Sequence, residues 1–327
     1  MLKYTIIRLL MMIPAFFGIT LISFLVIHLA PGDPTAILTE HNPRANPNLR
    51  QRLNEIYGLD KPLHVQYLNW VGGLIQLDFK KSMSQDPRPV SEKIKERLPV
   101  TLAMNLVSLA IILLLSFPIG LISAVRAGGA FDKISTMFVF IFFAAPSFWM
   151  ALLAMDLFGI KLQALPISGL TSYDYQSLSR LGKIVDLSKH LALPILISSL
   201  SGLAGISRYL RSNMLDIIRQ DYITTARAKG LSERMVIWKH ALRNALIPVI
   251  TILGLSVPGL VAGSVIIESI FAIPGLGLLM FEAVRQYDYT MVMGGLVMSA
   301  VLTLIGNLLA DLGYALADPR IRDTAFK

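Results

Sequence analysis

The sequence offers few residues whose types and spacing could carry out a reaction. Its five histidines are scattered, and none forms the His-Glu-x-x-His spacing of a zinc hydrolase. Gly182-Lys183 is followed by Ile184, so it does not form the phosphate-binding loop of an ATPase. There is no cysteine, and no serine has the Gly-x-Ser-x-Gly context of a hydrolase nucleophile. We therefore expect neither catalytic residues nor a metal site, and no cofactor bound by this chain.

Acidic residues within apolar stretches are the second group of candidates. Asp156, Glu268 and Asp311 lie in or near such stretches, where a charge usually faces a bundle interior or water. Each also has a simpler interpretation, as a solvated edge residue or a member of a structural pair. Glu268 follows a stretch rich in glycine and serine, which we expect to line a pathway through a membrane. The candidate pathway residues are Asn105, Ser256, Gly259, Gly263, Ser264 and Glu268.

A third candidate is the segment that begins at Asp221, which is predicted to form a short helix. Asp221 is a plausible N-cap, and Gly230 supplies the residue beyond the helix end, where a positive φ is needed. Leu231 can close that end by packing back. Ala226, Ala228 and Gly230 make the helix slender enough to enter a groove on another protein. A basic loop beside a membrane is the competing interpretation.

A second helix is predicted to follow and to lead into the next apolar stretch. Ser232 is its expected N-cap, and Pro248 lies where it joins that stretch. Helical spacing places Trp238, Leu242 and Leu246 on one face. The two helices together form a helix–turn–helix, which the apolar stretches must hold in place.

The composition identifies those stretches as membrane spans. Hydrophobic residues make up 54% of the 327 residues, charged residues only 16%, and the mean hydropathy is +0.61. Soluble domains carry about 25% charged residues, and a run of about 18 apolar residues is long enough to span a bilayer. The predicted spans are Leu9–Ala30, Leu98–Val125, Ile134–Ile160, Leu191–Ser207, Ala245–Phe271 and Tyr289–Ala317.

The distribution of basic residues predicts which side of the membrane each segment faces. The long segment 31–97 is discounted by the positive-inside rule, and the remaining basic residues place both termini in the cytoplasm. The first apolar run is longer than a signal-peptide core, so we expect it to be retained. Segment 31–97 is then outside, with apolar and aromatic residues at helical spacing. These are Ile56, Tyr57, Leu59, Leu63, Tyr67, Leu68, Trp70 and Leu74.

The cytoplasmic segment resembles the EAA loop of bacterial ABC importer permeases, in the variant of the dipeptide, oligopeptide and nickel permeases. The strings that carry this resemblance are Asp221-Tyr-Ile-x-Thr-Ala-Arg-Ala-Lys-Gly230-Leu231 and His240-Ala-Leu-Arg-Asn-Ala-Leu-Ile-Pro248. Further matches along the chain are His28-Leu-Ala-Pro-Gly-Asp-Pro34, Leu98-Pro-x-Thr-Leu102, Pro146-Ser-Phe-Trp149, Leu165-Pro-Ile-Ser-Gly169, Phe271-x-x-Pro-Gly-Leu-Gly277 and Asp318-Pro-Arg-Ile-Arg322. Thr224-Thr225-Ala226 departs from the generic Glu-Ala-Ala signature but fits the peptide variant.

The resemblance implies a B-type subunit: an all-α membrane protein of six transmembrane helices with the type I importer permease fold. Residues 1–327 would form a single permease domain, with outer segment 31–97 and coupling loop 208–244. The implied partners are a homologous second permease, two ABC ATPases that bind ATP and Mg²⁺, an extracytoplasmic substrate-binding protein and membrane lipid. Nucleic acid is not among them.

The resemblance also assigns roles to the coupling loop. ATPase-coupling residues would be Asp221, Tyr222, Thr225, Ala226, Arg227, Ala228, Lys229, Gly230, Leu231 and Ser232. The lever into the fifth span would contain His240, Arg243, Asn244 and Pro248. The family carries di- and oligopeptides, and the alternatives are nickel chelates, glutathione, haem and some sugars. A stand-alone transporter or channel is a rival hypothesis, although no inverted halves are visible.

Overall fold

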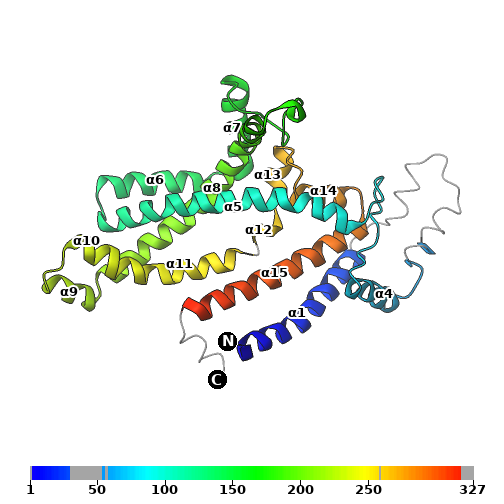
Figure 1. The fold of residues 1–327 in the computed structure, drawn as a ribbon, viewed down its shortest axis with the longest axis horizontal. Helices are drawn as coiled ribbons and strands as arrows, with labels where there is room; N and C mark the ends of the chain where they lie inside the picture. Colours follow the sequence, from blue (N-terminus) through cyan, green and yellow to red (C-terminus); the bar gives the residue numbers. More distant parts are fainter. Residues whose placement is uncertain (1, 30–53, 56–57, 258, 318–327) are drawn as a thin grey trace. The chain divides into compact units, whose positions relative to one another are not determined.

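The computed structural model describes residues 2–29, 54–55, 58–257 and 259–317, and in these ranges the chain is almost entirely helical (Figure 1). One isolated antiparallel bridge joins Lys81 to Pro89. The α-helices are α1 Leu2–Leu29, α4 Leu63–Ile75, α5 Val90–Val125, α6 Ala130–Ala144, α7 Ser147–Ala154, α8 Arg180–Ile218, α9 Asp221–Ala228, α10 Glu233–Met235, α11 Leu242–Ser256, α12 Gly259–Ala262, α13 Val265–Ile270, α14 Leu276–Arg285 and α15 Tyr289–Ala317. Met155–Lys161 and Val236–Ala241 are π-helical, and Tyr175–Ser177 is a 3₁₀ turn.

Among the described residues, five stretches of helix are long and apolar enough to cross a membrane, and a bent pair of helices gives a sixth if it is counted as one span. The five are Thr5–Leu29, Val90–Val125, Arg180–Ile218, Ile252–Ile270 and Tyr289–Gly313. This confirms the predicted all-α membrane protein. The fourth predicted span is the interior of a much longer helix, because α8 has 39 residues.

The third predicted span is not a straight helix. Within Ile134–Ile160 the chain bends by 100° between α6 and the helical stretch Ser147–Lys161. Ala145, with φ −78° and ψ 129°, leaves the helical region directly before Pro146. A residue before proline is pushed toward extended backbone, because the proline ring clashes with it in the α conformation. Hydropathy alone could not show this bend.

The fifth predicted span, Ala245–Phe271, is also interrupted. It contains most of α11, the short α12, and α13, which begins after Gly263. Gly263 has a φ of +68°, a left-handed conformation that glycine adopts without steric cost. Ser264 then caps α13 by accepting a hydrogen bond from the Ile267 N–H at 3.3 Å. The break falls at residues that we predicted to line a pathway.

The chain divides into two compact units. The first comprises Met1–Pro99 and Gly275–Lys327, and in it α1 packs along α15. The second comprises Val100–Pro274 and contains the predicted coupling loop. The expectation of a single permease domain stays a prediction.

In the first unit, a buried carboxylate fastens the outer segment to the start of α15. Asp288 Oδ1 accepts hydrogen bonds from the N–H groups of Met83 and Met291, both at 2.9 Å. Its other oxygen accepts from the Ser82 hydroxyl, which itself accepts from Lys93 Nζ at 2.9 Å. The predicted helix of the outer segment is present as α4, whereas Ile56 and Tyr57 lie outside the described residues.

Candidate functional site

The predicted coupling helix is present as α9, with its N-cap one residue earlier than expected. Gln220 occupies the cap position in an extended conformation, with φ −73° and ψ 148°, and Asp221 is the first helical residue. No side chain makes a capping hydrogen bond there, so the prediction of Asp221 as N-cap is wrong. In the first turn its carboxylate still interacts favourably with the helix dipole.

The end of α9 follows the predicted turn chemistry. Gly230 has a φ of +75° and is exposed, and its N–H donates to the Arg227 carbonyl at 2.9 Å. Leu231 is half-buried and packs back on the hydrophobic core, as expected. Ser232 occupies the N-cap of α10, although its side chain makes no capping bond.

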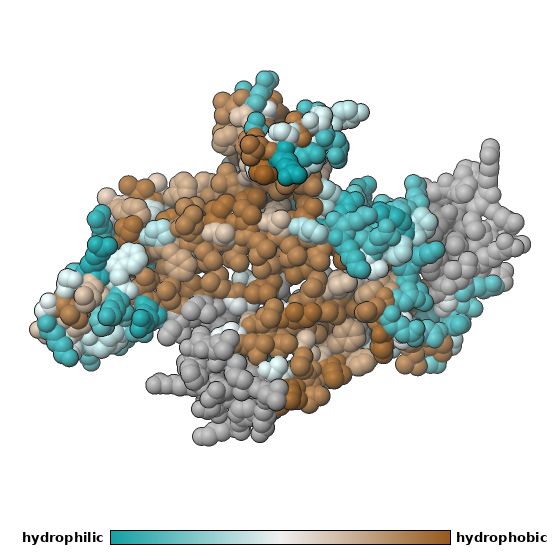
Figure 2. Space-filling view, in the orientation of Figure 1, coloured by the Kyte–Doolittle hydropathy of each residue, from teal (hydrophilic) through white to brown (hydrophobic). Residues whose placement is uncertain are grey.

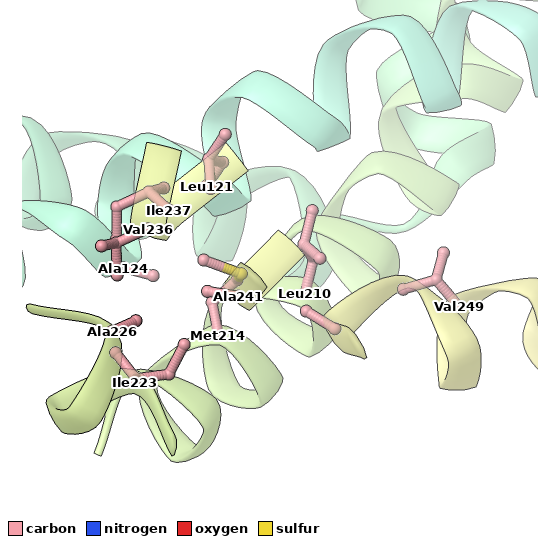
Figure 3. Packing of buried hydrophobic residues seen from close by; sticks show 11 residues of the cluster. Leu121, Ala124, Leu210, Met214, Ile223, Ala226, Val236, Ile237, Ala241 and Val249 are labelled. Atoms are coloured by element: carbon pink, nitrogen blue, oxygen red, sulfur yellow. The ribbon is translucent and has the colours of Figure 1, made fainter. Parts of the chain in front are cut away.

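One face of α9 is buried in a hydrophobic cluster within the second unit (Figure 3). Ile223 is fully buried, and Ala226, three residues later, is 7% exposed. The same cluster contains side chains from the ends of α5 and α8, among them Ala124 and Met214. Ala226 therefore attaches α9 to its own chain, and its methyl group does not lie on the exposed face. Burial of this face holds the helix in place.

The opposite face of α9 is polar and exposed. In Figure 2 hydrophilic residues gather over α9 and α10, whereas the adjoining lengths of α5 and α6 are apolar. The exposed coupling candidates are Asp221, Tyr222, Thr225, Arg227, Ala228, Lys229, Gly230 and Ser232.

A salt bridge within this surface links α9 to α10. The Arg227 guanidinium donates two hydrogen bonds to the Glu233 carboxylate, at 2.7 and 3.1 Å. The bond from Arg227 holds the pKa of Glu233 below its usual range. This pair joins Arg227 at the end of α9 to the first residue of α10.

The predicted lever is a continuous helical path from α10 to α11. The π-helical turn Val236–Ala241 joins them, and α11 contains Pro248. His240 is half-buried, whereas Arg243 and Asn244 are exposed.

The buried face of this lever differs from the predicted one. It is formed by Val236, Ile237, Ala241, Ala245 and Val249. The prediction that Trp238 shares a face with Leu242 and Leu246 is wrong, because Trp238 is 59% exposed. Leu242 and Leu246 do pack against the cluster.

A hydrogen bond connects α9 directly to the lever. Asn244 Nδ2 donates to the Tyr222 hydroxyl at 2.8 Å, across 22 positions of sequence. Together with the buried contacts of Ile223, it ties the two helices into one body. Movement of α9 would therefore be passed to α11.

Replacing Tyr222 with phenylalanine is expected to loosen this attachment without removing the ring. Loss of one such hydrogen bond costs about 1 kcal/mol, so amide exchange in α9 should become about fivefold faster. Hydrogen exchange measured by mass spectrometry checks this. Tyr209→Phe is the matched control, because Tyr209 is similarly exposed and its hydroxyl has no hydrogen-bond partner among the described residues. Equal rates in both variants would contradict the expectation.

The pathway candidates gather around the break in the fifth stretch. Asn105 Nδ2 donates to the Leu260 carbonyl at 2.8 Å. Glu268 is fully buried, and its Oε1 accepts from the Thr101 hydroxyl at 3.1 Å and from the Ser264 N–H at 3.3 Å. Ser264 and Glu268 thus cap α13 reciprocally, as in a capping box.

Ser256 and Gly259 lie in helices, and the other two acidic candidates, Asp156 and Asp311, form ion pairs. Ser256 donates to the Leu253 carbonyl at 2.8 Å, and Gly259 begins α12. Asp156 pairs with Lys161 at 2.7 Å and Asp311 with Arg8 at 2.9 Å. The carbonyl contact of Asn105 is a hydrogen bond between two helices, α5 and α12. A pathway role for any of these residues stays a prediction.

Comparison with known proteins gives the family. Residues 116–323 match "Binding-protein-dependent transport system inner membrane component", and residues 1–105 match the N-terminal domain of such membrane components. The chain belongs to this family. It is therefore a multi-pass permease subunit of an inner-membrane transport family, as the resemblance implied.

Full-length relatives support this assignment. The oligopeptide transport system permease protein AppB of Bacillus subtilis is 44% identical, with 98% of this chain and 99% of that protein covered. The di/tripeptide permease DppB of Pseudomonas aeruginosa is 37% identical, and the dipeptide permease DppB of Escherichia coli K12 is 36% identical. In both cases 98% of this chain and 99% of the relative are covered.

The structure of the permease also contains contacts that the sequence did not reveal. Ile223 and Ala226 are three positions apart, so a search for an apolar face on the short helix would have found them. The Tyr222–Asn244 hydrogen bond and an ion pair between Asp132 and Arg211 join residues far apart in the chain. No local sequence signal points to either contact.

Proposed function

We propose that this permease forms half of the translocation pathway of an ATP-driven importer for di- or oligopeptides. A homologous second permease would supply the other half, and an extracytoplasmic binding protein would deliver the peptide. Two ABC ATPases would bind ATP and Mg²⁺, one docking on the exposed face of α9 and the other on the corresponding helix of the second permease. The observation that carries this proposal is the similarity to named peptide permeases along nearly the whole chain. The exposed, internally anchored α9 supports the docking role.

Reconstituted uptake tests this function. The complex of both permeases and both ATPases is placed in vesicles with the binding protein, and uptake of labelled di- and oligopeptides is measured with and without ATP. ATP-dependent peptide uptake supports the proposal. Uptake driven by a proton gradient without ATP would favour a stand-alone transporter. ATP-dependent uptake confined to nickel chelates, glutathione or haem would overturn the peptide assignment.

We also propose that both termini and α9 lie in the cytoplasm, as the basic residues indicate. The chain has no cysteine, so single cysteines can report on its orientation. Lys133→Cys, an exposed position at the start of α6 on the same side as α9 in this topology, should react with a membrane-impermeant maleimide only after the cells are permeabilised. Tyr173→Cys, on the loop before α8, should react in intact cells, because Tyr173 is fully exposed and lies on the opposite side in this topology. The reverse pattern would contradict the proposed orientation.

A further inference from the structure

An ion pair between a buried carboxylate and a half-buried guanidinium joins α6 to α8. Asp132, in the first turn of α6, is 4% exposed. Arg211 of α8 donates Nε to Asp132 Oδ1 at 2.6 Å and Nη2 to Oδ2 at 2.7 Å. The Gly128 N–H donates to Oδ2 at 2.8 Å. A two-pronged pair of this kind fixes the relative orientation of the groups as well as their distance.

A second contact reinforces the junction of α6 and α8. Arg208 lies three residues before Arg211, and therefore on the same side of α8. Its guanidinium carbon is 4.1 Å from the centre of the Phe140 ring on α6, within the range of a cation–π contact. Ser123 of α5 and Ser135 of α6 are hydrogen-bonded at 2.9 Å. The start of α6 is thus held to both neighbouring helices.

The same part of α8 also anchors the coupling helix. Leu210 and Met214, on either side of Arg211 in sequence, are fully buried in the cluster that contains Ile223 of α9 (Figure 3). Only two residues separate the end of α8 from the start of α9. A displacement of α9 would therefore move the segment of α8 that carries Arg211.

We infer that Asp132 and Arg211 are positioning residues that carry the movement of α9 into α6. This inference rests on the proposed function and adds a connection to the one through α11. The π-helical turn and α11 lead from α9 to the interrupted fifth stretch, whereas the ion pair leads to the bent third stretch. A displacement of α9 would then move the third and fifth stretches together, as in rigid-body switching.

The chemistry of the Asp132–Arg211 pair suits it to fix the orientation of α6 and α8 more than to stabilise their contact. Asp132 is buried, and desolvation of a buried charge offsets much of the attraction to its partner, so well-packed apolar residues could hold two helices at least as well. What the pair adds is a fixed geometry, because the guanidinium fork meets the carboxylate in one arrangement. With this fixed geometry, a displacement of α8 would produce a defined displacement of α6.

The test measures how much peptide is taken up per ATP hydrolysed, in the reconstituted complex with its binding protein. Asp132→Asn and Arg211→Gln should each lower this ratio about five- to tenfold, a typical size for coupling between sites. Lys133→Gln is the matched control, because Lys133 is an exposed cation next to Asp132. It should leave the ratio unchanged. A normal ratio in both pair variants would overturn the inference.

A double variant separates positioning from folding. Asp132→Cys combined with Arg211→Cys gives this chain its only two cysteines, which a short bismaleimide can bridge after assembly with cysteine-free partners. Bridging should raise the lowered ratio, whereas a monofunctional maleimide should not. No recovery on bridging, or failure of every variant to assemble, would count against a positioning role. Loss of peptide uptake in the wild-type complex would instead refute the proposed function.

Discussion

Replacing Gly230 with arginine is expected to block the stable association of this permease with its ATPase. Gly230 has a φ of +75°, where a side chain is strained by about 1–2 kcal/mol. In the part of the chain that the structure describes, no atom lies within 4 Å of the position that a Cβ would occupy, so the arginine would protrude from the exposed end of α9. Because the proposed docking surface includes this end of α9, the added side chain should weaken ATPase binding at least about tenfold, or by about 1.4 kcal/mol. Co-purification of the ATPase with tagged permease measures the loss.

The control for this variant must reproduce the backbone strain at a distance from the docking surface. Gly58 of the outer segment has a φ of +67°, and no atom of the described residues lies within 4 Å of its Cβ position. Gly58→Arg should therefore carry a similar conformational cost while ATPase binding stays normal. Both variants should insert into the membrane at wild-type levels. Normal ATPase binding by Gly230→Arg would contradict the docking role of α9.

The extent of the coupling helix could be predicted because its signals are local. The glycine beyond the helix end and the alanine-rich helix before it lie within a few residues of one another, and the structure has α9 at Asp221–Ala228. The cap was misplaced by one residue because Asp221 suits the first turn as well as the N-cap position. Polar side chains at a helix start indicate its position to within a residue or two.

Hydropathy located the predicted spans but could not show whether each one is straight, bent or broken. An apolar run indicates that a segment can lie in a membrane, and it does so equally for straight, bent and broken helices. The bend at Pro146 was readable in principle, because proline restricts the residue before it. The break after Ala262 depends on the positive φ of Gly263, which the sequence permits but does not require.

The buried face of the lever could not be predicted from regular helical spacing. Trp238 was placed by counting 3.6 residues per turn, but Val236–Ala241 is a π-helical turn. Its wider turn rotates the preceding residues relative to α11, so regular spacing assigns Trp238 to the wrong face. The Asp132–Arg211 pair was out of reach for another reason, because 79 positions separate its members. Only the packing of α6 against α8 brings them together.

Truncating Ile223 to alanine is expected to uncouple ATP hydrolysis from transport while the spans stay folded. Ile223 is fully buried, and a buried isoleucine replaced by alanine typically costs about 2–5 kcal/mol. That cost falls on the attachment of α9, a helix of eight residues that is too short to be stable alone. Amide exchange should accelerate strongly in α9 and little in α15. Peptide uptake per ATP should fall at least about tenfold, because ATPase movement would no longer reach the spans.

Ile122→Ala tests whether burial is the cause of this effect. Ile122 lies on α5 next to Leu121 of the same cluster, but its side chain is exposed. The variant removes the same atoms near the same site without opening a cavity beneath α9, so exchange and uptake per ATP should stay close to wild type. If both isoleucine variants were equally impaired, general sensitivity of the region would explain the loss. If Ile223→Ala transported normally, the buried face of α9 would not transmit force.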